Sequence, residues 1–257
     1  MTRGATLVGF LLSILAGMGF QYGLDRGAVH HRQSTSSSAE PSSAEPSLDY
    51  PTASFRDDDV AVPMSSDDAV WGSHDALVTI VAFSNFQCGY CKGAARTLDE
   101  VRKDYGPDKL RIVFKNAPPV KVTPTHVAAM TVRGLEGNAA FWKFHDHAFR
   151  AMRSQDDDHF IRWAEQSGVK RGAFKKAWRS QRYAAAVDRD RALAEKLGIT
   201  TTPRFFINGV ALRGAQTRNR FGREIDRQLE EAEALIKDGT PRAQIYATLT
   251  NRHYPKQ

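Results

Sequence analysis

The sequence is poor in cysteine: among 257 residues there are two, Cys88 and Cys91. It has no glycine-rich phosphate-binding loop, so we expect no bound nucleotide. A zinc site needs four ligands, and with no second Cys-x-x-Cys pair and no HxxxH spacing nearby, this pair supplies two. A structural disulfide across so short a loop would remove little chain entropy. Redox chemistry is therefore the favoured interpretation, and the other two remain open.

The two cysteines lie where a strand is expected to pass into a helix. Residues 76–83 form an apolar run that predicts a buried strand, and residues 92–105 place Ala94, Leu98 and Val101 on one face of a helix. The first cysteine would meet unpaired helix N–H groups and the positive end of the helix dipole. Both stabilise a thiolate, so Cys88 is the predicted nucleophile. Cys91, one turn later, is close enough to form a disulfide with it and release a bound partner.

A second segment far along the chain belongs to the same pattern. Three consecutive threonines precede Pro203, and residues 204–207 predict a strand that ends in a turn at Asn208 and Gly209. Proline removes a backbone donor, so Pro203 belongs at the start or edge of a strand. It can also hold a cis bond in a tight turn.

Together these segments resemble the thioredoxin superfamily, and within it the DsbA-like thiol–disulfide oxidoreductases. The resemblance is carried by residues 78–92, 111–115 and 198–203, and it covers about residues 70–233. It implies an α/β thioredoxin fold with an inserted helical subdomain. By the same resemblance Cys88 attacks, Cys91 resolves, and a cis-proline at Pro203 helps to bind the partner's backbone. Thr202 would line the site, and the active-site dipeptide would be Gly89-Tyr90.

The chain departs from that family at two positions. Many relatives keep a buried carboxylate six residues before the first cysteine and another acid three residues before it, where this chain has Ala82 and Asn85. Removal of the proton from Cys91 would then use water or another group, and Lys115 on the neighbouring strand is the candidate relay. We expect this loss to impair reduction of substrates more than oxidation.

The direction of the reaction stays open between close alternatives. The resemblance implies oxidation of protein thiols, with disulfide isomerase or reductase activity as the alternative. The active-site dipeptide and Thr202 are more similar to DsbC-like isomerases, whose dimerisation domain has no evident counterpart here. A peptide- or metal-binding module on a thioredoxin fold is the non-enzymatic alternative. The cysteine pair would be its own cofactor, and no metal is expected.

The N-terminal part has a different composition from the rest. Residues 5–20 are almost wholly apolar after the single charge of Arg3, so residues 1–24 predict a signal anchor or signal peptide. No clear cleavage site follows, which favours an uncleaved anchor. Residues 25–68, rich in Ser, Pro, Glu and Asp, predict a disordered linker. The expected location is the bacterial cell envelope, on the periplasmic side of the cytoplasmic membrane. Expected partners are unfolded or thiol-containing secreted proteins and a membrane or soluble redox partner.

The net charge of +7 raises the question of nucleic-acid binding. The basic residues between 170 and 191 follow helical stretches interrupted by acids and alanines, with no aromatic-interleaved groove. A solvated helix face is therefore the preferred interpretation, a surface facing anionic lipid is an alternative, and no nucleic-acid partner is expected.

Periodicity predicts the organisation of the folded part. The DsbA-like domain should span 69–238, with a helical insertion at about 121–197 between strands 109–114 and 204–207. Helices are expected at 124–135, 139–152, 157–167, 171–180, 183–197 and 217–237, with a hairpin strand at 210–213. Residues 239–257 predict a helical extension, with a short helix at 242–249, and a tail. His145 and His147 would not share a helix face, which argues against a metal pair, and the acids at 156–158 suggest helix capping.

Overall fold

The computed structural model describes residues 59–119, 124–152 and 155–253. Its strands form one mixed sheet in the order β1-β3-β2-β4-β5. The strands are β1 (Ala69–Trp71), β2 (Val78–Ser84), β3 (Leu110–Asn116), β4 (Arg204–Ile207) and β5 (Val210–Arg213). The helices are α1 (Gly89–Lys109), α2 (Pro124–Arg150), α3 (Asp157–Gln166), α4 (Arg171–Arg179), α5 (Ala184–Lys196), α6 (Arg218–Lys237) and α7 (Ile245–His253), with a 3₁₀ turn η2 (Arg242–Gln244). This architecture is a thioredoxin fold with an inserted helical region.

The sheet is built around a β2–α1–β3 crossover unit. β2 and β3 are parallel, as a strand–helix–strand connection requires, and β4 pairs antiparallel with β2. The regular part of α1 ends before Gly106, whose φ of 71° is followed by Pro107, and the chain turns there into β3. The sequence did not predict β1, a three-residue strand antiparallel to β3 that is too short to show an alternating pattern.

Alternation along the strands separates two cores. Ile80, Ala82 and Phe114 face the larger core, which also contains Cys91 and Phe221 from α1 and α6. Val81, Phe83, Val113 and Phe206 face the smaller core, where residues of α5 cover the sheet. Successive side chains of a strand point to opposite faces of the sheet. Only every second residue of a strand can therefore face the core that contains Cys91.

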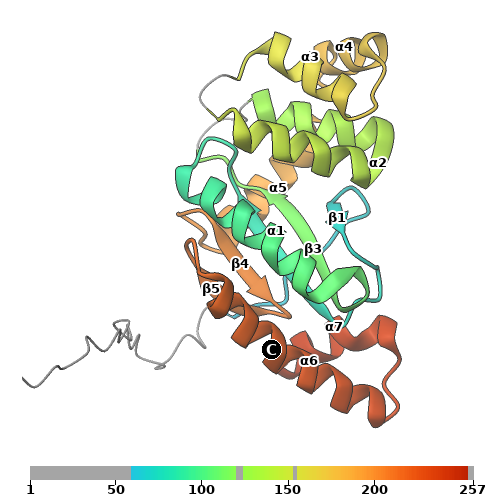
Figure 1. Cartoon of the computed structure of the whole chain (residues 1–257), viewed down its shortest axis with the longest axis vertical. Coiled ribbons are helices and arrows are strands. Elements are labelled where there is room, and N and C mark those ends of the chain that lie inside the picture. The colour runs from blue at the N-terminus through green and yellow to red at the C-terminus, as the bar shows by residue number, and fades with distance from the viewer. Residues whose placement is uncertain (1–58, 120–123, 153–154, 254–257) are drawn as a thin grey trace, which may run out of the picture. The chain divides into compact units, whose positions relative to one another are not determined.

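The helical insertion is made of α2, α3, α4 and α5. α2 bends at Gly137, whose φ is 81°, so its two halves correspond to the two helices predicted there. α3 and α4 pack on α2 at the end of the domain away from α6 (Figure 1). Asp156 caps α3 by accepting the backbone N–H of His159 at 2.9 Å, which is the capping function predicted for the acidic cluster.

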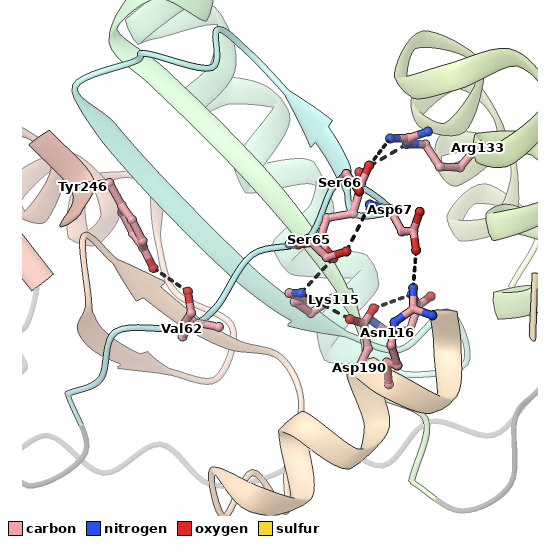
Figure 2. A network of polar contacts seen from close by, with 11 residues as sticks. Val62, Ser65, Ser66, Asp67, Lys115, Asn116, Arg133, Asp190 and Tyr246 are labelled. Atoms are coloured by element: carbon pink, nitrogen blue, oxygen red, sulfur yellow. Dashed lines mark hydrogen bonds and ion pairs between the residues drawn. The ribbon is translucent and has the colours of Figure 1, made fainter. Parts of the chain in front are cut away.

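Both predicted ends of the domain need correction. Residues 59–68, the N-terminal strap, were expected to belong to the linker, yet Val62 is buried in the smaller core. Residues from 239 onward were expected to form an extension, yet Ile245 and Leu249 are fully buried in the larger core. The hydroxyl of Tyr246 donates to the Val62 carbonyl at 2.9 Å, so the two ends of the described chain contact each other (Figure 2).

The anchor predicted at 1–24 and the linker as far as residue 58 lie outside the described residues. Across 59–119, 124–152 and 155–253, the helices all fall short of the length and apolar character that crossing a membrane requires.

Candidate active site

Cys88 occupies the N-cap position of α1, directly after the loop that follows β2. Its backbone is extended, with φ of −95° and ψ of 122°, and no side chain caps the helix start. The first N–H groups of α1 therefore have no side-chain acceptor at the end where Cys88 lies. Cys91 lies one turn inside and is 1% exposed, whereas Cys88 is partly exposed. Both are present as thiols. The helix start therefore presents one sulfur to solvent and buries the other.

The two thiols differ in acidity. Burial on its own would raise the pKa of the Cys88 thiol, but hydrogen bonds from the backbone and side chain of Cys91, followed by those from Thr202 and Tyr90, bring this pKa below its usual value. Burial raises the pKa of the Cys91 thiol to about 11. Cys88 is thus the better nucleophile and leaving group near neutral pH, and Cys91 holds its proton.

The loop that carries Pro203 lies directly against Cys88. The Thr202–Pro203 peptide bond is cis. The Cys88 thiol donates a hydrogen bond to the Thr202 carbonyl oxygen, and the sulfur lies 3.4 Å from that oxygen. Gly89 and Tyr90 are exposed beside it, and Tyr90 retains 75% of its accessible surface. The structure therefore brings together the six residues that the sequence placed at the centre of the site: Cys88, Gly89, Tyr90, Cys91, Thr202 and Pro203.

Ala82 lies where the resemblance located it, beside Cys91. A cavity of about 10 Å³ is lined by Ala82, Ser84 and Cys91 together with Trp142 and His145 from α2. The backbone N–H of Asn85 donates to the Cys91 Sγ at 3.4 Å. The sequence did not link α2 to the cysteines, because His145 is 54 positions from Cys91 and no local pattern joins them.

Lys115 does not reach this cavity, so its predicted role as proton relay is wrong. Lys115 is two positions from Val113 on β3, so the two side chains point to the same face of the sheet, the face of the smaller core. Ala82 and Cys91 lie in the larger core on the other face. The Lys115 Nζ lies 2.7 Å from the Asp68 Oδ1. The same Nζ lies 3.3 Å from the Asp190 Oδ1 (Figure 2). All three side chains are buried, and Lys115 therefore joins the N-terminal strap to α5.

A chain of buried polar side chains extends from the active-site loop to this ion-pair cluster. The Asn85 Oδ1 lies 3.3 Å from the His126 Nε2, and the His126 Nδ1 lies 2.9 Å from the Asn116 Oδ1. The Asn116 amide donates to Asp190 at 2.7 Å. Burial lowers the pKa of His126 to about 3, so this imidazole is neutral and has a structural role. Nothing in the sequence around His126 marks it.

Within the described ranges, no three side chains of His, Cys, Asp or Glu come together as a metal-binding group. His145 is buried, and His147, two residues later, is partly exposed.

Known proteins match part of this chain in sequence. A family model described as Thioredoxin matches residues 64–227. Among curated relatives, the Na⁺/H⁺ antiporter NhaA of Herminiimonas arsenicoxydans is 31% identical over 148 residues, which are 58% of this chain and 23% of that protein. NhaA 1 of Salinispora arenicola is 28% identical over 191 residues, 67% of this chain and 29% of that protein. The chain thus spans about a quarter of the length of these relatives.

Solved structures share the fold at lower identity. Alpha-DsbA1 of Wolbachia pipientis is 21% identical with a TM-score of 0.58, and the match covers 68% of this chain and 96% of that one. Oxidised BdbD of Bacillus subtilis is 22% identical with a TM-score of 0.58, covering 67% and 98%. The catalytic domain of Proteus mirabilis ScsC is 21% identical with a TM-score of 0.54, covering 66% and 93%.

Proposed function

The chain belongs to the thioredoxin family, and from this premise we propose that it is a protein thiol–disulfide oxidoreductase acting through Cys88 and Cys91. The observation that carries the proposal is the inequality of the two thiols. The pKa of Cys88 is lowered and its sulfur is partly exposed beside the cis Thr202–Pro203 bond, while Cys91 is buried with a raised pKa. A pair that only held the fold together would not need an accessible, acidified member.

The exchange proceeds through a mixed disulfide at Cys88. When the protein oxidises a substrate, a substrate thiolate attacks the Cys88 sulfur of the Cys88–Cys91 disulfide, and Cys91 leaves and is protonated. A second substrate thiolate then attacks the substrate sulfur of the mixed disulfide, and Cys88 leaves as a thiolate. The substrate loses two electrons and gains a disulfide, and the cysteine pair takes up both electrons without another cofactor.

The lowered pKa of Cys88 favours oxidation of substrates as the main direction. A stabilised Cys88 thiolate stabilises the dithiol form, which makes the disulfide form a stronger oxidant. Isomerase or reductase work is the alternative, because the same mixed disulfide is an intermediate in each. The substrates proposed are unfolded or thiol-containing secreted proteins, with a membrane or soluble redox partner that restores the disulfide. Thr202, with Pro203, would contact the substrate backbone beside Cys88.

The proposed location is the bacterial cell envelope. Support comes from the apolar segment 5–20 with the single preceding charge at Arg3, followed by a Ser/Pro/Glu/Asp-rich stretch. Such a segment would tether or deliver the domain to the periplasmic side of the cytoplasmic membrane, where substrate thiols meet oxidising conditions.

The test is capture of the mixed disulfide. Oxidised wild-type protein is mixed with a reduced peptide that carries two thiols, and the products are followed by mass spectrometry while the reduction potential is measured in glutathione buffers. Wild type should convert the peptide to its disulfide. The Cys91→Ala variant, first activated with oxidised glutathione at Cys88, should accumulate an adduct at Cys88 with a matched peptide that carries one thiol, because that peptide has no second thiolate to attack the mixed disulfide.

Cys88→Ser is the matched control and should form no adduct and no peptide disulfide. A non-enzymatic binding module predicts another result: the peptide would still bind to Cys88→Ser with unchanged affinity, and wild type would leave its thiols reduced. That outcome would overturn the proposed function.

A further inference from the structure

One buried titratable side chain has no role in the exchange described above. His145, on α2, is 5% exposed and lies among aromatic rings. The centroids of the Trp142 and Phe149 rings are each 4.8 Å from that of its imidazole, and Phe114 lies at 5.5 Å. Burial of an imidazole in apolar surroundings costs free energy unless its polar atoms are paired. Such a residue in a core needs an explanation.

Asp146 sets the tautomer of His145. The Asp146 Oδ1 lies 2.9 Å from the His145 Nδ1, and an ionised carboxylate accepts hydrogen bonds only. The imidazole proton is therefore on Nδ1, and Nε2 keeps its lone pair. Within the described residues, the hydrogen bond of this imidazole is the one at Nδ1. Asp146 holds the imidazole in the orientation and tautomer that a proton acceptor needs.

His145 and Cys91 share one cavity. Its volume of about 10 Å³ is close to that of a single water-sized sphere. Ser84 also lines it, with a hydroxyl that can donate and accept. Trp142 lines it as well, and the indole N–H of Trp142 has no acceptor in the described part of the chain. The walls thus supply the two or more polar groups that one bridging water requires.

We propose that His145 accepts the proton of Cys91 when Cys91 resolves a mixed disulfide at Cys88, and that Asp146 is the positioning residue for this transfer. The inference rests on the proposed function and extends it to the proton. Ala82 lines the same cavity at the position where the resemblance implies a carboxylate, and an alanine cannot take a proton. His145 would carry out this step from α2 instead of β2.

The step balances without any further reactant. The Cys91 S–H bond breaks, and its proton passes through one water to the His145 Nε2. The Cys91 sulfur bonds to the Cys88 sulfur, and the bond between Cys88 and the substrate sulfur breaks with its electron pair on the substrate. The imidazolium then returns the proton to the departing thiolate or to solvent. The substrate is reduced and the cysteine pair is oxidised.

The surroundings of His145 fix its resting protonation state. Burial lowers the pKa of His145, so the imidazole is neutral near pH 7, with Asp146 favouring its protonated form and Arg102 opposing it. The charged groups that interact with it are Asp146 on its own helix and Arg102 from α1, of opposite sign. β2 and β3 contribute uncharged Ser84 and Phe114 to the shared cavity. With its pKa at about 11, Cys91 is ionised on the order of one part in ten thousand at pH 7, so an acceptor matters most there.

The experiment follows the reactions of both cysteines in one absorbance time course. Reduced full-length protein is mixed with a limiting amount of dithiobis-nitrobenzoate, an aromatic disulfide that releases a coloured thiolate. Attack by Cys88 gives the first release, and resolution by Cys91 gives the second. Wild type is compared with His145→Gln, Asp146→Asn and the matched control His147→Gln from pH 6 to 10.

His145→Gln should leave the first release unchanged and slow the second by about tenfold or more at pH 7, as expected for loss of a proton acceptor. In that variant the second release should accelerate by nearly a factor of ten per pH unit and approach the wild-type rate at high pH. The wild-type profile should be much flatter. Asp146→Asn should slow the second release by a smaller factor, and His147→Gln should not alter either release.

Failure of the inference is distinguishable from failure of the proposed function. If wild type shows no fast first release, the proposed function is wrong. If the first release is fast and the second has the same rate and pH profile in wild type and in folded His145→Gln, the inference is overturned. If His145→Gln does not fold by circular dichroism, Asp146→Asn decides, and an unchanged second release in that folded variant overturns the inference.

Discussion

At the scale of single residues, two identical thiols one helical turn apart acquire opposite properties. The acidity of Cys88 depends partly on the Cys91 side chain, which stabilises the thiolate by a hydrogen bond. Cys91→Ala removes that donor and keeps the backbone N–H, so the pKa of Cys88 should rise and its alkylation rate at pH 7 should fall by a few-fold, because less of the thiol is ionised. Alkylation rates with iodoacetamide across pH measure this change.

Cys91→Ser is the control for this substitution, since its hydroxyl can still donate to the thiolate. It should keep the pKa of Cys88 closer to the wild-type value. Equal Cys88 titration curves in the alanine and serine variants would show that the helix N-terminus and Thr202 stabilise the thiolate without help from the Cys91 side chain.

At the scale of elements, the buried Asp68–Lys115–Asp190 cluster joins the N-terminal strap, β3 and α5. Lys115→Met would leave two buried carboxylates without their cation, so the free energy of unfolding should fall by about 3–5 kcal/mol. Urea denaturation followed by circular dichroism measures this loss. If the variant remains folded, the second release of the disulfide probe should keep its wild-type rate, because Lys115 faces away from Cys91.

Arg171→Ala is the control that tests whether the loss of stability expected for Lys115→Met is large because its ion pairs are buried. Arg171 pairs with Glu165 at 3.0 Å on the surface, where both side chains are well exposed, so its loss should cost at most about 1 kcal/mol. A Lys115→Met variant as stable as Arg171→Ala would contradict the view that the cluster holds the strap in place.

At the scale of the whole molecule, buried neutral histidines make stability depend on pH. The pKa of His126 is about 3 in the folded state, against an ordinary value of 6.5. Between these values the unfolded chain binds a proton that the folded chain does not, so this contribution to stability is full above pH 6.5 and is lost as pH falls toward 3. Its slope approaches about 1.4 kcal/mol per pH unit.

The measurement is urea unfolding at intervals between pH 4 and 7. His126→Gln should be less stable than wild type at pH 7, because the imidazole ring that packs against Phe86 is lost. The stability of this variant should fall less steeply on acidification than that of wild type. Parallel curves for wild type and His126→Gln would show that His126 titrates normally in the folded state.

Much of the fold could be predicted from the sequence because it depends on neighbours along the chain. Apolar periodicity predicted β2, α1 and β3, and in the structure they form a parallel strand–helix–strand crossover. The glycines at 137, 168 and 198 have positive φ, at the bend of α2 and just after α3 and α5, which agrees with the helix bounds predicted from the sequence. The placement of Cys88 at a helix start and of Pro203 beside it also came from local patterns, together with a family resemblance.

What the sequence by itself determined is this local order, and with it the identity of the thiols. Only the tertiary structure decided which side chains surround them. Strand register turns Lys115 away from Cys91, and packing of α2 on the sheet brings His145 to the cavity beside Ala82. It also decided that the N-terminal strap and α7 belong to the folded domain. The physical reason is that such contacts join residues tens of positions apart, through register and packing that no local periodicity encodes.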